Sequence, residues 1–367
     1  MTADATPSEM EMPVRIRPNV AALPAYVAGK TKASPRAVKL SSNENPNPTL
    51  ATIVNAIEAR ARGVNRYPDM YGIPLVEALS ERFEVPADRV VVGNGSVALL
   101  FHILATVAGP GDKVVMAWRS FEAYPIGIGT VGAQSVAVPL GAGERHDLAA
   151  MLEAANTDPA VTAVLLCTPN NPTGPTLSEA EVRGFLDGLR PGVLVLLDEA
   201  YCHFVRDGAA VDGLDLVDDY ANLIVLRTFS KAYTLAGLRV GYAVAGDARL
   251  ASAVRAVSTP FGVNALAEAA AIAALACEDE LAGQIEGIVS ERERVVGVLR
   301  EHGWGIPETQ GNFFWLPYPG LVDAIVAACA ADDITVRPFP EGVRVSIGTP
   351  EENDRLLAAL LTISVGH

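Results

Sequence analysis

Short apolar runs rich in Val, Leu and Ile, separated by longer stretches of helical periodicity, restrict the folds open to this chain. Most of the runs do not alternate with polar residues, which is typical of strands buried on both faces. The pattern therefore predicts an α/β fold in which a mostly parallel sheet lies between helices. The predicted strands are 89–93, 113–117, 134–139, 162–167, 192–198, 222–228 and 240–245, and the intervening helices include 96–108, 121–131, 178–190 and 248–257.

The chain has 367 residues, which is too long for one simple core, so we expect two domains. Residues 1–12 are predicted to be a disordered tail, and residues 13–49, with six prolines, to pack with the C-terminal part. Residues 50–264 would form the large domain. Residues 265–367 would form a smaller α+β domain, which opens with an Ala- and Glu-rich helical stretch over about 264–302.

Charge and hydropathy exclude several classes of partner. The formal net charge is -15, so phosphate backbones and anionic lipids are repelled, and we expect neither nucleic acid nor membrane as a partner. No apolar run reaches the length of a membrane span, and the N-terminus lacks a signal-peptide pattern. Four cysteines without C-x-x-C spacing, and no metal-ligand pattern, predict reduced core thiols in a cytoplasmic protein without a metal site. They are Cys167, Cys202, Cys277 and Cys329.

The segment 222–242 places an amine just after a predicted strand. Lys231 follows the strand end, where α/β folds bind ligands in a crevice. Thr228, Ser230 and Arg239 supply two hydroxyls and a guanidinium, which suit a doubly charged phosphate. The alternative is a solvated Ser-Lys loop with an arginine in a surface salt bridge.

The run 194–201, LVLLDEAY, delivers Asp198 at the end of a buried strand and Tyr201 three residues later. A buried carboxylate costs several kcal/mol unless a cation meets it, and the protonated pyridine nitrogen of a bound cofactor is such a cation. Tyr201 could then donate to the ring oxygen of that cofactor. A helix cap is the alternative, although it explains Glu199 better than Asp198.

Two turns after predicted strands complete the pattern. In 167–181, Asn171 lies in a turn fixed by proline and glycine, where its amide can bond a ring oxygen. In 90–100, Gly95, Ser96 and Val97 open a helix whose N-terminal amides can meet phosphate. The first is also simply a good turn. The second resembles a dinucleotide turn, but the third glycine of that fingerprint is missing.

The order of G-N-G-S, W-R-S-F-E-A-Y-P, N-N-P-T-G, D-E-A-Y and S-K-A-Y-T-L-A-G-L-R-V-G resembles the fold-type I aminotransferases dependent on pyridoxal 5'-phosphate. The likeness runs from about residue 15 to 360 and is strongest to the histidinol-phosphate and aromatic aminotransferase branch. It implies that Lys231 holds the cofactor as a Schiff base and that Asp198 keeps the ring nitrogen protonated. Pyridoxamine 5'-phosphate would be the second form of the cofactor.

The resemblance also implies roles for residues that the pattern alone does not single out. Phe121 would stack on the pyridine face, although it is otherwise an ordinary core residue. Tyr67, otherwise a turn residue, would reach the cofactor phosphate of a neighbouring subunit, which implies a homodimer with shared active sites. Arg344 would bind the substrate carboxylate, against the alternative of a structural salt bridge. The substrate pocket would also include Tyr26, Asn43 and Arg337.

The motifs are most similar to those of the aromatic, or phenylalanine, aminotransferases. We therefore expect an aromatic L-amino acid to be transaminated with 2-oxoglutarate, giving the aromatic 2-oxo acid and glutamate. Histidinol phosphate is the alternative amino donor, since Arg337 and Arg344 could bind either anion. A decarboxylase or β-eliminating lyase would use the same groups. A nonenzymatic cofactor-binding regulator is disfavoured because Lys231 and Arg344 are both present.

Overall fold

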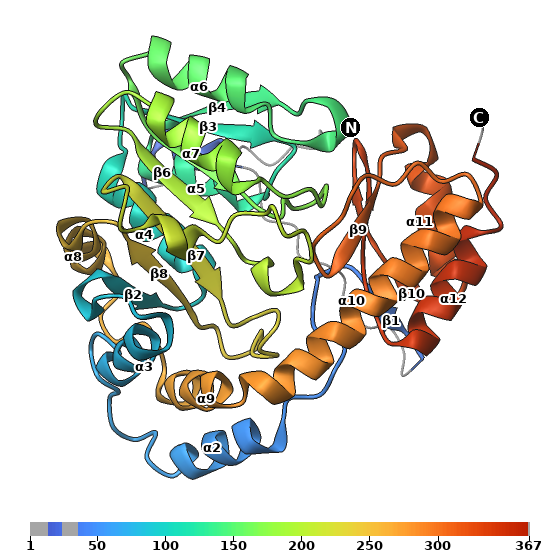
Figure 1. Ribbon diagram of the computed structural model, residues 1–367, viewed down its shortest axis with the longest axis horizontal. Coiled ribbons are helices and arrows are strands. Elements are labelled where there is room, and N and C mark those ends of the chain that lie inside the picture. The colour runs from blue at the N-terminus through green and yellow to red at the C-terminus, as the bar shows by residue number, and fades with distance from the viewer. Residues whose placement is uncertain (1–13, 24–35, 366–367) are drawn as a thin grey trace, which may run out of the picture.

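The computed structural model describes residues 14–23 and 36–365, and a seven-stranded sheet lies at its centre. The strand order is β2-β8-β7-β6-β5-β3-β4 (Figure 1). β8 runs antiparallel to both of its neighbours and the other pairs are parallel, which confirms the predicted mostly parallel sheet. The strands are β2 (Val90–Gly93), β3 (Lys113–Trp118), β4 (Gln134–Pro139), β5 (Val161–Cys167), β6 (Leu194–Asp198), β7 (Leu223–Thr228) and β8 (Gly241–Ala245).

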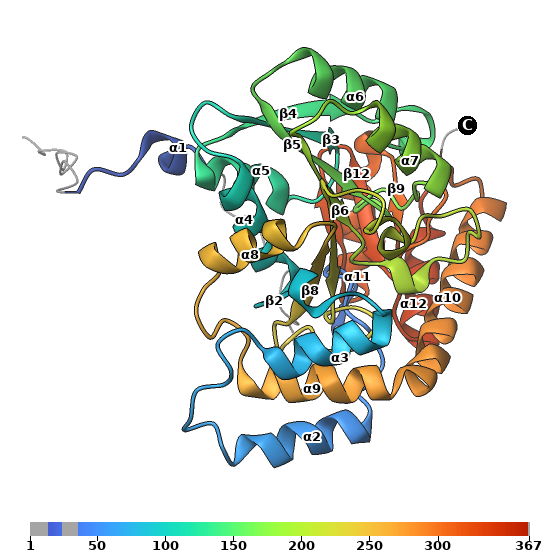
Figure 2. The same cartoon turned by 60° about the vertical axis from the view of Figure 1, so that its left-hand side comes forward.

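Alternating residues of the central strands enter two separate cores, one on each face of the sheet. In β6, Leu194 and Leu196 belong to one core, whereas Val195 and Leu197 belong to the other. The first core is covered by α4 (Ser96–Val107), α5 (Ala123–Val131) and α8 (Ala248–Val257). The second is covered by helices that include α3 (Ile73–Phe83), α6 (Leu148–Thr157) and α7 (Glu179–Gly188) (Figure 2).

β4 has the predicted bounds, 134–139, but it is not one of the strands buried on both faces. This strand lies at the edge of the sheet, and Val138 is its single buried residue. Gln134 and Ser135, which are exposed, begin the strand. An edge strand has one neighbour only, so polar residues can stay in contact with water there.

The helical stretch expected over 264–302 is two helices rather than one. α9 (Ala265–Ala276) ends at Cys277, whose φ of −112° and ψ of 20° are not helical, and α10 (Glu278–Glu301) follows. Three acidic residues open α10, where they complement the helix dipole. α9 packs against α2 (Ala51–Ala61) and α3, on the large-domain side of the molecule (Figure 1). The domain boundary expected after residue 264 stays a prediction, and the packing of α9 leads us to propose Cys277 instead.

The C-terminal part contains a three-stranded antiparallel sheet of order β11-β12-β9. Its strands are β9 (Phe313–Leu316), β11 (Arg337–Phe339) and β12 (Gly342–Ser346), and α12 (Pro350–Leu360) packs against both α10 and α11 (Val322–Ala331) (Figure 1). This is the α+β organisation that the sequence predicts.

The N-terminal segment touches both parts of the molecule. β1 (Val38–Lys39) pairs in parallel with β10 (Ile334–Thr335), next to the small sheet. α1 (Pro18–Ala21) lies against α5 instead, where the Asn19 amide donates to the Gly129 carbonyl at 2.8 Å. The later part of the segment thus packs with the C-terminal strands and residues 18–21 pack with α5, while the assignment of the whole of 13–49 to the small domain stays a prediction. The tail predicted over 1–12 lies outside the described residues.

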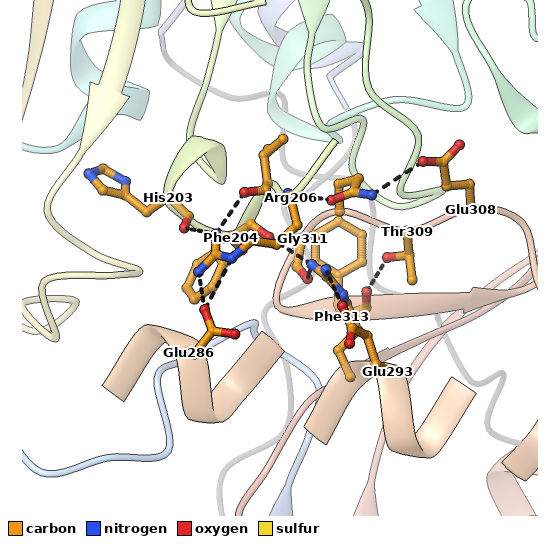
Figure 3. Close-up of polar contacts among 12 residues, drawn as sticks. His203, Phe204, Arg206, Glu286, Glu293, Glu308, Thr309, Gly311 and Phe313 are labelled. Carbon is orange, nitrogen blue, oxygen red and sulfur yellow. Dashed lines mark hydrogen bonds and ion pairs between the residues drawn. The ribbon is translucent and has the colours of Figure 1, made fainter. Parts of the chain in front are cut away.

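A buried arginine of α10 connects the C-terminal part to the loop that follows β6. The Nη1 of Arg292 donates to the Phe204 carbonyl at 2.9 Å and to the Gly311 carbonyl at 3.1 Å. Beside it, Arg206 bonds Glu286 through its guanidinium (Figure 3). Burial lowers the pKa of Arg292 to about 10. Because Tyr201 directly precedes the turn Cys202–Phe204, this junction holds one wall of the site described below.

Replacing Arg292 with methionine is expected to destabilise the protein by about 1–3 kcal/mol for each carbonyl left without a donor. Arg294, on the same helix, provides a matched control. It pairs with Glu291 and Asp354 while 39% of its side chain is exposed, so Arg294→Met should cost no more than about 1 kcal/mol. Urea-induced unfolding of both variants measures the difference, and equal losses would contradict the role given to Arg292.

The remaining expectations concern thiols, membranes and metals. The four cysteines are free, and Cys167, Cys277 and Cys329 are buried, in agreement with the prediction. Over 14–23 and 36–365, no helix combines the length and apolarity needed to cross a bilayer. The same residues contain no cluster of three or more His, Cys, Asp or Glu side chains suited to a metal ion.

Candidate active site

A cavity of about 300 Å³ opens at the carboxyl ends of β5, β6 and β7. This is the edge of an α/β sheet at which ligands bind. The structure brings together here most of the residues predicted from the sequence, although they come from distant segments. Those that line the cavity are Ser96, Val97, Phe121, Asn171, Asp198, Tyr201, Thr228, Ser230, Lys231, Arg239, Arg337 and Arg344.

Glycines allow the backbone to approach closely at one end of this cavity. Gly95 has a φ of +81°, and a Cβ there would lie 2.6 Å from Nη2 of Arg239. A Cβ on Gly241 would lie 2.7 Å from the backbone nitrogen of Ser96. Ser96 is the first residue of α4, so its amide belongs to the positive end of the helix dipole. A larger residue at either glycine would therefore displace the guanidinium of Arg239 or the backbone at the start of α4.

Two hydroxyls and a guanidinium face the same end. The Thr228 hydroxyl donates to Oγ of Ser230 at 3.0 Å and also accepts from the Ser230 backbone N–H at 3.1 Å. Nη1 of Arg239 lies 3.4 Å from Oγ of Ser230. Together with the N-terminus of α4, these donors form an anion site suited to a phosphate group, which we call the phosphate cup.

Asp198 is a buried carboxylate at the end of β6. Its Oδ2 accepts from the Tyr124 hydroxyl at 2.9 Å, and its Oδ1 accepts from the Ala200 N–H at 3.2 Å. Desolvation raises the pKa of Asp198 to about 6, and these two hydrogen bonds oppose the rise. Within 14–23 and 36–365 it forms no ion pair. Glu199, the better candidate for a helix cap, instead forms a buried ion pair with Arg227 at 2.7 Å.

Lys231 projects into the cavity from the loop after β7. Its Nζ donates to the Ser42 carbonyl at 3.0 Å. Desolvation lowers the pKa of Lys231 to about 7, and the charges of Arg344 and Arg239 lower it further while Glu44 raises it. The amine is therefore available in its neutral form near neutral pH, as a nucleophile or proton-transfer group requires.

Tyr201 and Asn171 occupy the wall between Asp198 and the small sheet. The Tyr201 hydroxyl accepts from Nδ2 of Asn43 at 3.0 Å, and burial raises its pKa. Oδ1 of Asn171 accepts from Nη1 of Arg344 at 2.7 Å. Nη2 of Arg344 also donates to the Ser41 carbonyl at 2.6 Å. Arg344 thus enters the site from β12 in a fixed orientation.

Some predicted residues lie elsewhere. Asn43 is buried behind Tyr201 and does not line the cavity, whereas Gly95 lies just behind the phosphate cup. Tyr67 is 81% exposed and stacks on Phe261 at 4.7 Å between ring centroids, away from this cavity. Tyr26 lies outside the described residues.

The sequence did not single out several residues of the site. Ser41, Ser42 and Glu44 line the cavity from an extended loop that has no recognisable pattern. Glu122 and Tyr124 are different, because they lie in the segment S-F-E-A-Y that supplied Phe121. Glu122 lies just before α5 and Tyr124 lies within its first turn, so both side chains are near the strand ends. If the expected helix had been started at residue 123 rather than 121, the sequence would have indicated this position for both residues.

This arrangement agrees with the similarity of the chain to known proteins. Residues 35–360 match the model of the family described as aminotransferase class I and II. The chain belongs to this family and is an aminotransferase.

The chain is also similar to individual proteins, which include two relatives and one solved structure. The chain is 48% identical to the aromatic amino acid aminotransferase of Streptomyces avermitilis, over 94% of this chain and 96% of that protein. It is 47% identical to the aromatic amino acid aminotransferase of Thermobifida fusca, over 95% and 97% of the two chains. The structure of histidinol-phosphate aminotransferase from Sinorhizobium meliloti in complex with pyridoxal-5'-phosphate has a TM-score of 0.87 and 28% identity, and covers 95% of this chain and 97% of that chain.

Proposed function

We propose that this aminotransferase uses pyridoxal 5'-phosphate to transaminate an aromatic L-amino acid with 2-oxoglutarate. One observation supports the cofactor assignment above all: the amine of Lys231, the carboxylate of Asp198 and the phosphate cup line a single cavity. The solved structure from Sinorhizobium meliloti contains the same cofactor on a similar fold.

The residues present fit this cofactor at both ends. The glycine at position 95 leaves room for a phosphate beside Arg239, since a Cβ there would reach the guanidinium. At the other end, a buried carboxylate with a hydroxyl and an amide as its partners is suited to a ring nitrogen that carries a proton. Phe121 lines the cavity between them and lies edge-on to Tyr124 at 5.6 Å between centroids.

The cofactor, when bound, supplies an electron-poor ring that accepts electrons from the substrate α-carbon, and pyridoxamine 5'-phosphate is its amino-carrying form. The amine of Lys231, neutral near pH 7, removes and returns the α-proton. Asp198 would keep a positive charge on the ring nitrogen, and Tyr201 and Asn171 would bond the ring oxygen. Arg344 binds the substrate carboxylate, and its bonds to Asn171 and Ser41 hold the guanidinium in place.

The choice of amino donor rests on the relatives and is tested by rates. Eight proteins named aromatic amino acid aminotransferase are 44–48% identical to this chain, whereas the histidinol-phosphate enzyme compared above is 28% identical. We expect phenylalanine to exceed histidinol phosphate in kcat/KM with 2-oxoglutarate as acceptor. A hundredfold preference for histidinol phosphate, about 2.7 kcal/mol of transition-state binding, would overturn the donor assignment and leave the family unchanged.

We also propose a homodimer with shared active sites. Several of the large hydrophobic side chains exposed on the single chain lie in residues 64–73 and 257–261, and Tyr67 of the first segment stacks on Phe261 of the second. Val64 is 59% exposed, Tyr71 49% and Phe261 39%, next to the exposed Tyr67. Such a surface is typical of a protein interface. Sedimentation of the cofactor-loaded enzyme as a fully active monomer would refute this proposal. The cytoplasmic location expected from the sequence stays a prediction.

A further inference from the structure

Two residues outside the cavity join the loops that carry Tyr201 and Lys231. His203 follows Tyr201 by two residues on the loop after β6, and Tyr233 follows Lys231 by two residues on the loop after β7. Nε2 of His203 lies 3.1 Å from the Tyr233 hydroxyl, and the two rings pack edge-on with centroids 4.9 Å apart. Neither side chain lines the cavity, and Tyr233 is only 1% exposed. The contact therefore connects the two loops from behind.

Both residues are also connected to α10. The Tyr233 hydroxyl donates to Oε1 of Glu278, the first residue of that helix, at 2.6 Å. On the other loop, Nη1 of Arg206 donates to the His203 carbonyl at 3.1 Å, and Arg206 bonds Glu286 of the same helix. Figure 3 shows the His203 ring pointing away from that junction. The ring and the backbone of His203 thus reach α10 through separate partners.

The protons available to these groups fix the direction of the hydrogen bonds. Burial raises the pKa of Tyr233 well above its ordinary value, so the hydroxyl keeps its proton and gives it to Glu278, which is paired with Arg82. The hydroxyl can then only accept from His203, whose pKa burial lowers to about 3. The neutral ring must therefore carry its proton on Nε2, and its Nδ1 accepts from the Cys202 thiol at 3.4 Å. Donors aligned in one direction strengthen one another.

The position of Tyr233 affects the turn that holds Lys231. The Leu235 N–H donates to the Phe229 carbonyl at 3.1 Å and closes this turn. The Tyr233 ring packs on the Phe229 ring at 4.7 Å between centroids, so a displaced tyrosine would move the turn with it. The amine of Lys231 lies 5.7 Å from the centre of the Tyr201 ring. A misplacement of about 1 Å can slow a reaction by about 10²-fold.

We propose that these contacts form a positioning chain, which holds Lys231 relative to Tyr201 and connects both loops to α10. His203 and Tyr233 are positioning residues, because they act through the two loops and do not face the cavity. This inference rests on the proposed function, since it names what keeps the proton-transfer amine in place. The members of the chain are Cys202, His203, Tyr233 and Glu278.

Tyr233→Phe tests the inference because it keeps the ring and removes the hydroxyl that joins His203 to Glu278. We expect kcat with phenylalanine and 2-oxoglutarate to fall at least about tenfold, while KM for phenylalanine changes less than about threefold, since Arg344 still binds the carboxylate. Cofactor-free variant should also take up pyridoxal 5'-phosphate covalently at least about tenfold more slowly than the wild type near neutral pH.

His203→Gln should restore what a loss of the imidazole would remove. The amide of glutamine can donate to the Tyr233 hydroxyl in the place of Nε2. We therefore expect this variant to keep kcat and the rate of covalent uptake within about threefold of the wild type. His203→Ala, which offers no donor, should behave like Tyr233→Phe.

Tyr242 on β8 provides a matched control. It is fully buried and also packs on Phe229, at 5.6 Å between centroids. Its hydroxyl is hydrogen-bonded to no member of the positioning chain. Tyr242→Phe removes a buried hydroxyl without breaking the chain, so kcat and the rate of covalent uptake should stay within about threefold of the wild type.

Nitrogen NMR of cofactor-free protein with ¹⁵N-labelled histidine observes the chain without turnover. The ring signals that are missing from His203→Gln identify His203. In the wild type they should show the proton on Nε2, and in Tyr233→Phe they should shift because the acceptor is lost. This measurement on the wild type decides the direction of the chain even if Tyr233→Phe does not fold.

The outcomes separate this inference from the proposed function. A proton on Nδ1 of His203, a wild-type kcat in Tyr233→Phe, a loss confined to KM, or an equal loss in Tyr242→Phe would overturn the positioning chain. Wild-type enzyme that does not transaminate phenylalanine would overturn the proposed function instead. The NMR and covalent-uptake results would stand in that case, since neither depends on the amino donor.

Discussion

Lys231→Ala is expected to lower the transamination rate by at least about 10³-fold, because a positioned proton-transfer group contributes up to about 10⁴-fold. The variant should still fold and hold the cofactor without a covalent bond, since Ser96, Thr228, Ser230 and Arg239 remain in the phosphate cup. Borohydride treatment of the loaded protein should attach the cofactor to the wild-type chain and not to the variant. Mass spectrometry of the treated proteins measures this directly.

Lys39 serves as the control for this experiment. It lies near Lys231, and its Nζ is paired with Glu44, which lines the same cavity. Lys39→Ala should keep both the covalent attachment and most of the rate. If Lys231→Ala turned over at the wild-type rate, or were still labelled, the amine of another residue would have to perform the chemistry.

The pKa of Lys231 gives the same prediction a pH dependence. Addition to the cofactor aldehyde requires a neutral amine, and the folded protein holds the pKa at about 7 rather than at the ordinary 10.5. The rate at which cofactor-free protein takes up pyridoxal 5'-phosphate covalently should therefore rise with pH up to about 7 and level off above it. A rate that continued to rise towards pH 10 would show that burial does not lower this pKa.

Asp198→Ala is expected to weaken cofactor binding by about two to four orders of magnitude. Removing one partner of a buried charge pair costs about 3–5 kcal/mol, and the uncharged ring that remains is a poor electron acceptor. Activity should fall at least in proportion, even at saturating cofactor. Equilibrium dialysis gives the affinity and single-turnover kinetics give the rate. Unchanged values would require a different partner for the ring nitrogen.

In cofactor-free protein, by contrast, the charge on Asp198 is expected to lower the stability of the wild-type chain relative to Asp198→Ala. In the folded chain the pKa of Asp198 is about 6, above its ordinary 3.8, so the folded state binds the proton more tightly than the unfolded state. The contribution of this carboxyl to stability therefore falls as the pH rises from about 4 to about 6. The wild-type protein should lose up to about 3 kcal/mol relative to Asp198→Ala across this window. A difference independent of pH would contradict the raised pKa.

Most of the sheet could be predicted because its strands are continuous apolar runs. β3, β5, β6 and β7 lie within a residue or two of the expected ranges, since a strand buried on both faces has no polar positions to confuse the pattern. β4 also has the expected bounds, although Val138 is its single buried residue, because this strand lies at the edge of the sheet. The sequence pattern also did not indicate the break at Cys277, where the alanine-rich α9 ends and the more polar α10 begins.

Site residues could be predicted from the sequence where they directly follow the end of a strand. Asp198 and Lys231 are positioned by β6 and β7, and parallel strands bring their carboxyl ends to one edge whatever the loops do. Residues contributed by loops and by the small sheet were readable only through the resemblance to a family. Ser42 and Glu44 had no signal at all, because an extended loop has no periodicity from which its neighbours can be inferred.

The amino-acid sequence by itself determined the α/β sheet, the family motifs and the placement of an amine and a buried carboxylate at the ends of neighbouring strands, because these depend on local hydrophobic pattern and on the order of strands. The tertiary structure alone decided which charges meet. Tyr124 reaches Asp198 across 74 residues, and Arg337 reaches Glu122 across 215. Such long-range contacts set the pKa of the carboxylate and the net charge of the pocket, since electrostatic energies depend on distance and burial in the folded chain.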